Sequence, residues 1–256
     1  MDAMAPVLET HGLTIRFGGH VAVNDVTCAF QPGTLTAIVG PNGAGKTTYF
    51  NLISGQLTAT AGRVLVRGED VTRLPAAART RRGLGRAFQL TNLFPNITVF
   101  ENVRLAVQAR ARAGLSLFTL WTDRRDLMHA ADTILGRVKL GDKREMVAGA
   151  LPHGDQRKLE VALLIALEPE VFMFDEPTAG MSVDEVPNVL EIVGELKRGA
   201  GKTILLVEHK MDVVRSLADR IIVLHNGVLV ADGEPAEVMG SAIVREAYLG
   251  QELEDA

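Results

Sequence analysis

Residues 40–47 bring together the residue types that bind phosphate. The segment reads Gly-Pro-Asn-Gly-Ala-Gly-Lys-Thr, so that two glycines enclose four residues, and Lys46 and Thr47 follow directly. Glycines allow backbone N–H groups to turn toward phosphate oxygens, a lysine brings a mobile cation to the outer phosphates, and a threonine hydroxyl can ligate Mg²⁺. The run 35–39 predicts a buried strand before this loop, and 48–53 predicts a helix after it. The sequence therefore predicts that a nucleoside triphosphate binds here, at Gly40, Pro41, Asn42, Gly43, Ala44, Gly45, Lys46, Thr47 and Thr48.

Two later segments carry groups that can act on a bound phosphate. Residues 171–174 predict a buried strand, and Asp175 and Glu176 follow at its carboxyl end, where α/β proteins bind ligands. Asp175 can hold Mg²⁺, directly or through water, and Glu176 can orient or deprotonate the attacking water. His209 follows the buried strand 203–207, from which it could reach a γ-phosphate. Taken alone, the acids also fit two surface carboxylates and the histidine a structural role; the phosphate-binding loop favours the functional interpretation.

Strands with alternating apolar residues precede the phosphate-binding loop. Residues 12–30 alternate around Gly18-Gly19 and predict an antiparallel hairpin. Phe17 lies just before the turn, where its ring could stack on an adenine, although its spacing fits an ordinary strand aromatic equally well. Residues 63–68 predict another short strand, and 221–230 predict a second hairpin that turns at Asn226-Gly227.

A helical segment interrupts these strands. Residues 94–150 contain no convincing strand pattern, while Thr98 and Glu101 form a capping box that begins a helix toward Arg112. Helical spacing returns from Asp123 to Val138. Phe118 and Trp121, between the two helices, are expected to pack in this segment or to contact a partner.

The complete pattern predicts one mixed α/β domain over residues 1–256. Its core, with an antiparallel β part, covers 1–93 and 151–256, and a helical lobe over 94–150 is inserted into it. Apolar helices are expected after residue 156 and over 187–198, and the tail after Leu249 is expected to fray.

Composition limits the possible partners and compartment. The net charge of −4 argues against coating by nucleic acid, and the basic run of Arg79, Arg81, Arg82 and Arg86 is interpreted as a solvated or interface-facing cluster. Cys28 is the sole cysteine, so a reducing compartment is expected, and no metal-ligand cluster is evident. No targeting segment is evident, and the longest apolar run is far shorter than the ~18 residues that span a bilayer. A cytoplasmic location follows, with membrane contact only through a partner.

Taken in order, these motifs resemble those of ATP-binding-cassette ATPases. The resemblance covers nearly the whole chain and includes the phosphate-binding loop, the acids after residue 174, His209, and the further segments Gln89, Leu151–Asp155 and Ala179–Ser182. The ATPase subunits of bacterial branched-chain amino-acid uptake systems are the most similar group, on residues 16–19, 22–26, 51–55, 179–181 and 246–250. The resemblance implies a P-loop NTPase core with a mostly parallel sheet, an antiparallel β subdomain and an inserted helical lobe.

The resemblance also implies roles for individual residues. Two such chains, either identical or different, would pair head to tail, with two ATPs and Mg²⁺ clamped between the phosphate loop of one and the signature segment of the other: Leu151, Pro152, His153, Gly154 and Asp155. Phe17 would stack on adenine, Lys46 and Glu176 would act in hydrolysis, and His209 would contact the γ-phosphate. Gln89 would link Mg²⁺ to transmembrane permease subunits, which would dock near it against the helical lobe. Hydrolysis would then power import from the inner face of the membrane, with Thr47, Gln89 and Asp175 at the metal.

Departures from the family pattern leave other functions open. The signature commonly reads Leu-Ser-Gly-Gly-Gln, whereas this chain has Pro152, His153 and Asp155; the Asp155 carboxylate is expected to turn toward the backbone amides of its own helix. Ser182 replaces a more usual aspartate. The alternatives are urea or amide uptake, lipopolysaccharide extraction, a nucleotide-binding subunit with little activity, and an ATP switch acting on nucleic acid or the ribosome.

Overall fold

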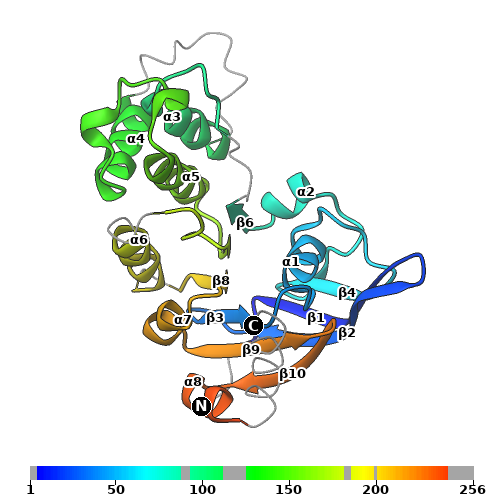
Figure 1. Ribbon diagram of the computed structural model, residues 1–256. Helices are drawn as coiled ribbons and strands as arrows, with labels where there is room; N and C mark the ends of the chain where they lie inside the picture. The colour runs from blue at the N-terminus through cyan, green and yellow to red at the C-terminus, as the bar shows by residue number, and fades with distance from the viewer. Residues whose placement is uncertain (1–4, 88–92, 112–124, 182–185, 199–200, 242–256) are drawn as a thin grey trace. The chain divides into compact units, whose positions relative to one another are not determined.

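The computed structural model describes residues 5–87, 93–111, 125–181, 186–198 and 201–241 (Figure 1). The chain divides by its internal contacts into two compact units, which are described separately below. The first contains residues 1–86, 170–176 and 196–256, and the second contains residues 87–169 and 177–195. The first unit thus includes the phosphate-binding loop, the acids Asp175 and Glu176, and His209.

Within the described ranges, ten strands form two sheets. A four-stranded sheet has the order β2-β1-β4-β5, and its neighbouring strands are antiparallel. A six-stranded sheet has the order β10-β9-β3-β8-β7-β6, in which β9, β3, β8 and β7 run parallel and β10 is antiparallel to β9. The strands are β1 (Leu8–Phe17), β2 (His20–Phe30), β3 (Leu35–Val39), β4 (Ala61–Val66), β5 (Glu69–Asp70), β6 (Leu84–Ala87), β7 (Val171–Asp175), β8 (Thr203–Val207), β9 (Arg220–His225) and β10 (Val228–Gly233).

The central strands of the six-stranded sheet are largely apolar, which explains why both faces of this sheet are buried. In β3, Ile38 belongs to the larger core, which also contains residues of the four-stranded sheet and Phe50 of α1 (Lys46–Ser54). Its neighbours Ala37 and Val39 belong to a smaller core with Val214 of α7 (Met211–Leu217). Successive side chains of a strand point to opposite faces, so a continuous apolar run places apolar side chains on both faces.

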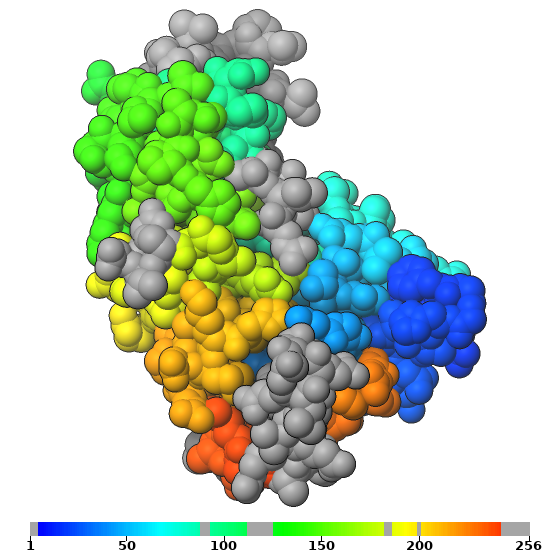
Figure 2. Space-filling view, viewed as in Figure 1, coloured from blue at the N-terminus to red at the C-terminus, as the bar shows by residue number. Residues whose placement is uncertain are grey.

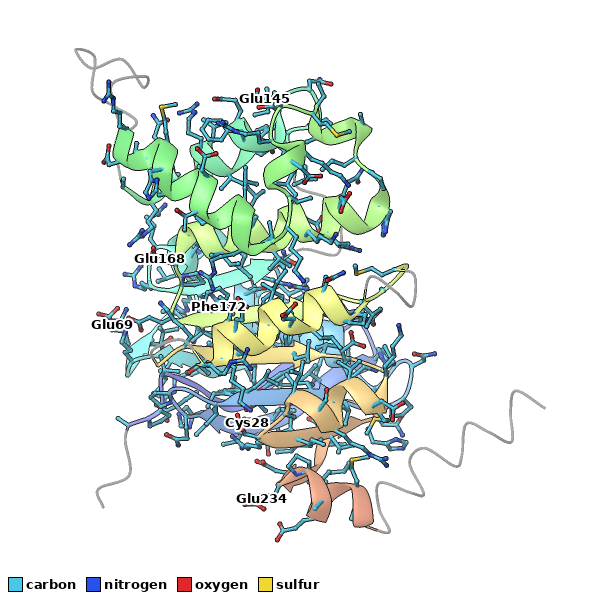
Figure 3. The ribbon with its side chains drawn as sticks, turned by 90° about the vertical axis from the view of Figure 1, so that its left-hand side faces the viewer. Cys28, Glu69, Glu145, Glu168, Phe172 and Glu234 are labelled. Carbon is cyan, nitrogen blue, oxygen red and sulfur yellow. The ribbon has the colours of Figure 1, made fainter. Side chains whose placement is uncertain are left out.

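The first unit surrounds the start of α1 with strands. Figure 2 shows the β1–β2 hairpin, in dark blue, beside the lighter blue α1. Cys28, labelled in Figure 3, is buried among these strands, and burial raises its pKa to about 11. The short helices α2 (Ala76–Thr80) and α8 (Pro235–Gly240) complete the unit.

The second unit is helical. It contains α3 (Val99–Arg110), α4 (Arg125–Arg137), α5 (His153–Leu167) and most of α6 (Val186–Arg198), with 3₁₀ turns at Gly141–Lys143 and Ala148–Ala150. The Thr98 hydroxyl accepts a hydrogen bond of 3.1 Å from the Glu101 amide, which is one half of the expected capping box. No helix in the described part of the chain has both the length and the hydropathy needed to cross a bilayer.

The mixed α/β fold predicted from the sequence is confirmed. The first hairpin is longer than expected, since β1 already begins at Leu8, and its register pairs Phe17 with His20. The second hairpin turns at Asn226 and Gly227, which both have positive φ angles, of 48° and 77°. Such angles are what a two-residue turn between twisted strands requires.

The interpretation of the arginine run as a solvated cluster is wrong for two of its four members. Arg79 is 2% exposed and donates to four backbone carbonyls, and the Arg86 side chain is 7% exposed and pairs with Asp175. Arg81 is exposed and Arg82 is partly exposed. The run alone does not reveal this burial, because Leu52 and Ile53, which bond Arg79, and Asp175, which bonds Arg86, lie 26 to 89 positions away.

Candidate nucleotide-binding site

The phosphate-binding loop connects β3 to α1, and its shape depends on glycine. Gly45 is the N-cap of α1 and has φ 95°, and a Cβ on it would lie 2.4 Å from the Ala22 carbonyl oxygen. The turn of the second hairpin supports the loop, because the Gly227 amide donates to the Ala44 carbonyl oxygen at 3.1 Å. In turn, the Asn24 amide of β2 donates to the Gly227 carbonyl at 2.8 Å. The loop is therefore supported by the turn between β9 and β10, and this turn is bonded to β2 of the other sheet.

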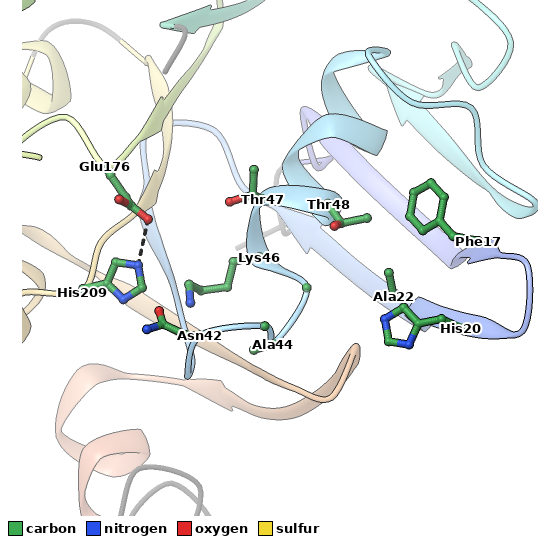
Figure 4. Close-up of a pocket in the computed structure, with 12 residues that line it drawn as sticks. Phe17, His20, Ala22, Asn42, Ala44, Lys46, Thr47, Thr48, Glu176 and His209 are labelled. Carbon is green, nitrogen blue, oxygen red and sulfur yellow. Dashed lines mark hydrogen bonds and ion pairs between the residues drawn. The ribbon is translucent and has the colours of Figure 1, made fainter. Parts of the chain in front are cut away.

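A cavity of about 420 Å³ lies over this loop (Figure 4). The loop and the start of α1 line its floor, Phe17, His20 and Ala22 of the hairpin lie at one side, and Glu176 and His209 lie at the other. Phe17 is 49% exposed, so its ring face is available to an aromatic ligand. The N-terminus of a helix such as α1 offers N–H donors that have no partner within the helix and a partial positive charge, and both favour a phosphate.

Lys46 lies within its own loop. Its Nζ donates to the carbonyl oxygens of Gly40 at 2.6 Å and Pro41 at 2.8 Å, and the residue is 6% exposed. Burial lowers the pKa of Lys46, while the nearby carboxylates of Glu176 and Asp175 act in the opposite direction. The Lys46 ammonium is the group of this set that can attract the phosphates of an anionic ligand, whereas the two carboxylates favour a cation between them and the phosphates.

Parallel strands bring the acids and the histidine to the loop. In the register of the sheet, Ile38 of β3 and Asp175 of β7 both pair with Val207 of β8, so the carboxyl ends of these three parallel strands lie side by side. Glu176 then adopts φ 50°, and its amide donates to the Val207 carbonyl at 2.9 Å. Its Oε1 lies 2.8 Å from Nε2 of His209, the contact drawn in Figure 4. A non-glycine residue with positive φ at such a place is typical of a functional site.

Asp175 is closed off from solvent by Arg86. Its Oδ2 accepts a hydrogen bond of 2.8 Å from Nη2 of Arg86, and the two side chains are 0% and 7% exposed. Burial raises the pKa of Asp175, and the Arg86 guanidinium acts against this shift. Its Oδ1 is buried without a hydrogen-bond partner among the described residues.

These residues fit a magnesium ion. The orphaned oxygen of Asp175 is an acceptor that a hard cation or its water could satisfy, and the Thr47 hydroxyl lies at the cavity. Protein ligands to Mg²⁺ are commonly one or two oxygens, with water and substrate phosphates as the others.

The signature segment lies in the second unit, at the start of α5. Pro152 is the N-cap and offers no side-chain hydrogen bond, and the helix begins at His153. A Cβ on Gly180 would lie 3.2 Å from the His153 ring, so the ring packs closely on the segment after Pro177. Leu151 is buried, and its carbonyl accepts a hydrogen bond of 2.9 Å from the Gln156 side chain.

The expectation for the Asp155 carboxylate is wrong. It does not turn to the amides of its helix; Oδ2 binds Nζ of Lys143, and Oδ1 accepts from Nζ of Lys158 at 2.8 Å. Burial acts to raise the pKa of Asp155, but the hydrogen bonds and charges of the two lysines outweigh it and hold the pKa below its usual value. Two cations next to the carboxylate bind it more strongly than neutral amides would.

Some predicted residues lie outside the described ranges. They are Gln89, Phe118, Trp121, Ser182 and the tail after Leu249. Conversely, the structure gives four residues a role at the site that the sequence patterns did not predict: His20 and Ala22 line the cavity, Gly227 supports the loop, and Arg86 contacts Asp175. The pairing of His20 with Phe17 could have been predicted from the two-residue turn between them.

Comparisons with known proteins show the family of this chain. Residues 23–179 match the model of the ABC transporter family. The chain is 39% identical over 251 residues to the high-affinity branched-chain amino acid transport ATP-binding protein LivG of Escherichia coli, covering 96% of this chain and 98% of LivG. It is 36% identical to BraF of Pseudomonas aeruginosa, which has the same description, with the same coverage.

A solved structure shows the same fold. The ADP conformation of MJ1267, an ATP-binding cassette of an ABC transporter, matches with a TM-score of 0.82 and 29% identity, over 96% of this chain and all of that one. The chain belongs to the ABC transporter family. It is an ATP-binding cassette ATPase, in which hydrolysis of ATP is coupled to transport.

Proposed function

We propose that this chain is the Mg²⁺-dependent motor subunit of a branched-chain amino-acid importer. The similarity to LivG and BraF, whose names state this transport, supports the solute class. The contact of 2.8 Å between Glu176 and His209, at the edge of the cavity over the phosphate-binding loop, carries the assignment of the catalytic site.

Within one chain, different residues of the cavity bind the adenine, bind the phosphates and activate the attacking water. Phe17 stacks on the adenine, and the loop from Gly40 to Thr48 binds the phosphates through its amides, with Lys46 leaving its own carbonyls for the outer phosphates. Glu176 accepts a proton from the attacking water while His209 holds the carboxylate in place. When bound, Mg²⁺ neutralises charge that develops on the phosphates; Thr47, Asp175 and Gln89 hold it.

Two chains work together in this proposal, each offering its signature segment to the nucleotide of the other. Pro152 provides no hydroxyl, so the start of α5 acts through its backbone amides and those of Gly154. Asp155 would repel phosphate if it were alone, but Lys143 and Lys158 place two cations beside one carboxylate. The segment therefore remains attractive to an anion.

The transmembrane permease subunits bind on the membrane side, near Gln89 and the helical lobe of 94–150, and hold the ATPase on the inner face of the membrane. ATP drives closure only if the closed pair binds ATP more tightly than the open pair does. Hydrolysis reverses this preference, which couples the chemical step to alternating access in the permease.

Hydrolysis of ATP by the purified chain tests the catalytic assignment. Glu176→Gln keeps size and removes the base, so turnover should fall by about 10² or more, while ATP binding persists and a dimer accumulates in size-exclusion chromatography. Glu170→Gln is the matched control, because Glu170 pairs with Arg67 away from the cavity. Full activity of Glu176→Gln would contradict the assignment.

Uptake by cells tests the solute. A host that lacks its own importer, supplied with the permease and this chain, should take up labelled leucine, isoleucine or valine, and Glu176→Gln should abolish the uptake. Uptake of urea or an amide in place of these solutes, or release of lipopolysaccharide, would replace the amino-acid assignment and leave the ATPase assignment intact.

A further inference from the structure

Arg86 joins two parts of the proposed metal site. It lies on β6, and its Nη2 donates to Oδ2 of Asp175 at 2.8 Å. Its Nη1 donates to Oδ1 of Asn51 at 2.6 Å and to the hydroxyl of Ser54 at 2.9 Å, both on α1. The guanidinium also lies 5.5 Å from the centre of the Phe50 ring. One buried cation therefore connects the end of β7 with the helix that begins at the phosphate-binding loop.

The pattern of these bonds leaves one carboxylate oxygen free. A guanidinium can bind both oxygens of a carboxylate at once, yet here a single nitrogen bonds Oδ2 and the other terminal nitrogen serves α1. Oδ1 of Asp175 has no hydrogen-bond partner among the described residues although it is buried. A buried orphan oxygen is costly unless a ligand satisfies it.

We propose that Arg86 is a positioning residue for the metal: it binds Oδ2 of Asp175 and fixes it to α1, so that Oδ1 is the oxygen presented to Mg²⁺ or its water. This inference rests on the proposed function, in which Asp175 and Thr47 hold the Mg²⁺ that accompanies ATP. Partners behind the ligands of a metal orient those ligands, and their loss weakens metal binding by about 10 to 100-fold.

Two opposing effects determine whether the loss of Arg86 weakens or strengthens metal binding. A guanidinium near the site repels a dication, so its loss could by itself strengthen binding. However, Lys46 is a second cation whose charge acts on Asp175. Without Arg86, the buried carboxylate would turn to Lys46, and both groups would be lost to the metal and the phosphates. Orientation therefore outweighs repulsion, and removal of Arg86 should weaken metal binding.

Nucleotide binding with and without metal tests the proposal. Titration calorimetry of the full chain with a non-hydrolysable ATP analogue, once in EDTA and once in MgCl₂, gives the gain in affinity that depends on Mg²⁺. In Arg86→Gln the dissociation constant in EDTA should stay within about twofold, whereas the gain from Mg²⁺ should fall about tenfold, or vanish if it is smaller than that. Arg86→Lys should be intermediate, because one nitrogen can pair with Asp175 but cannot also bind α1.

Two further variants keep the test decisive. Arg82→Gln is the matched control: Arg82 pairs with Glu69 on the surface, and its loss should leave both constants unchanged. Asn51→Ala removes one of the two acceptors that hold Arg86 to α1 but keeps both charges, so it should reduce the gain from Mg²⁺ by a smaller factor even if Arg86→Gln fails to fold. Equal weakening of Arg86→Gln in EDTA and MgCl₂ would show a structural role only, and a larger gain from Mg²⁺ would show competition; either result overturns the proposal.

Asp175→Asn separates this inference from the proposed function. If the wild type does not bind the analogue, or gains nothing from Mg²⁺, the proposed function fails and this inference fails with it. If the wild type gains but Asp175→Asn gains equally, the assignment of Asp175 to the metal is wrong. If Asp175→Asn loses the gain and Arg86→Gln keeps it, only the role of Arg86 is overturned.

Discussion

Replacement of Arg79 should destabilise the first unit more than replacement of any exposed arginine. All three nitrogens of its guanidinium donate to backbone carbonyls: Nε to Leu74 at 2.9 Å, Nη2 to Thr72 at 2.7 Å, and Nη1 to Leu52 and Ile53 at 2.7 Å each. The last two carbonyls belong to the final turn of α1, where intrahelical donors are missing.

The expected loss of stability can be estimated from these four hydrogen bonds. Hydrogen bonds to a charged group contribute about 1.5 to 3 kcal/mol each, which gives roughly 6 to 12 kcal/mol before desolvation. Burying the guanidinium costs several kcal/mol, and Arg79→Met removes this cost together with the bonds. We expect Arg79→Met to lower the free energy of unfolding by about 3 to 5 kcal/mol, because four buried carbonyls lose their donor.

Urea unfolding followed by circular dichroism measures this loss. Arg81→Met is the matched control, since Arg81 is exposed, and it should change stability by less than about 0.5 kcal/mol. Arg79→Lys tests the geometry, because one ammonium cannot reach carbonyls that three nitrogens now serve. If Arg79→Lys were as stable as the wild type, or Arg79→Met lost less than about 1 kcal/mol, the hydrogen-bond argument would be refuted.

Two further predictions concern the phosphate loop and the signature segment. Gly45→Ala should destabilise the chain more than Gly68→Ala: both glycines have positive φ, which costs about 1 to 2 kcal/mol for alanine, but only the added Cβ of Gly45 meets a carbonyl, at 2.4 Å; equal melting temperatures would contradict this. Asp155→Asn should destabilise by about 1 to 2 kcal/mol at pH 7. Because the folded pKa of Asp155 is lowered, its contribution is present above the unfolded pKa and is lost as the pH falls through the folded pKa. The difference from wild type should therefore shrink below about pH 4, and a difference independent of pH would exclude the ion pairs as its cause.

Local patterns were enough to predict the parts of the site that depend on neighbours in sequence. The strand at 203–207 has the predicted bounds, and the loop of residues 40–47 connects a strand to a helix as expected. The turn at Asn226 and Gly227 is another local feature. In each case, the residue types needed by the backbone occur within a few positions of one another.

Contacts between distant residues could not be predicted in this way. Arg86 and Asp175 are 89 positions apart, and they meet because β6 lies next to β7 in the sheet. The sequence over β6, Leu-Gly-Arg-Ala, has no alternation that predicts a strand. Lys158, by contrast, follows Asp155 by three residues on one helix, so that pair could have been predicted from spacing.

The two buried arginines of the basic run both bond groups near the C-terminal end of α1. Arg79 holds backbone carbonyls at the end of α1, and Arg86 holds the side chains of Asn51 and Ser54 in the same turns. The N-terminus of this nine-residue helix is the phosphate-binding end. Arg79 therefore anchors the C-terminal turn of the helix that begins at the loop, and Arg86 joins that helix to Asp175 of the proposed metal site. The charges of residues 79 and 86 are therefore part of the architecture of the nucleotide site, and their burial, rather than any contact with nucleic acid, explains why this acidic protein carries them.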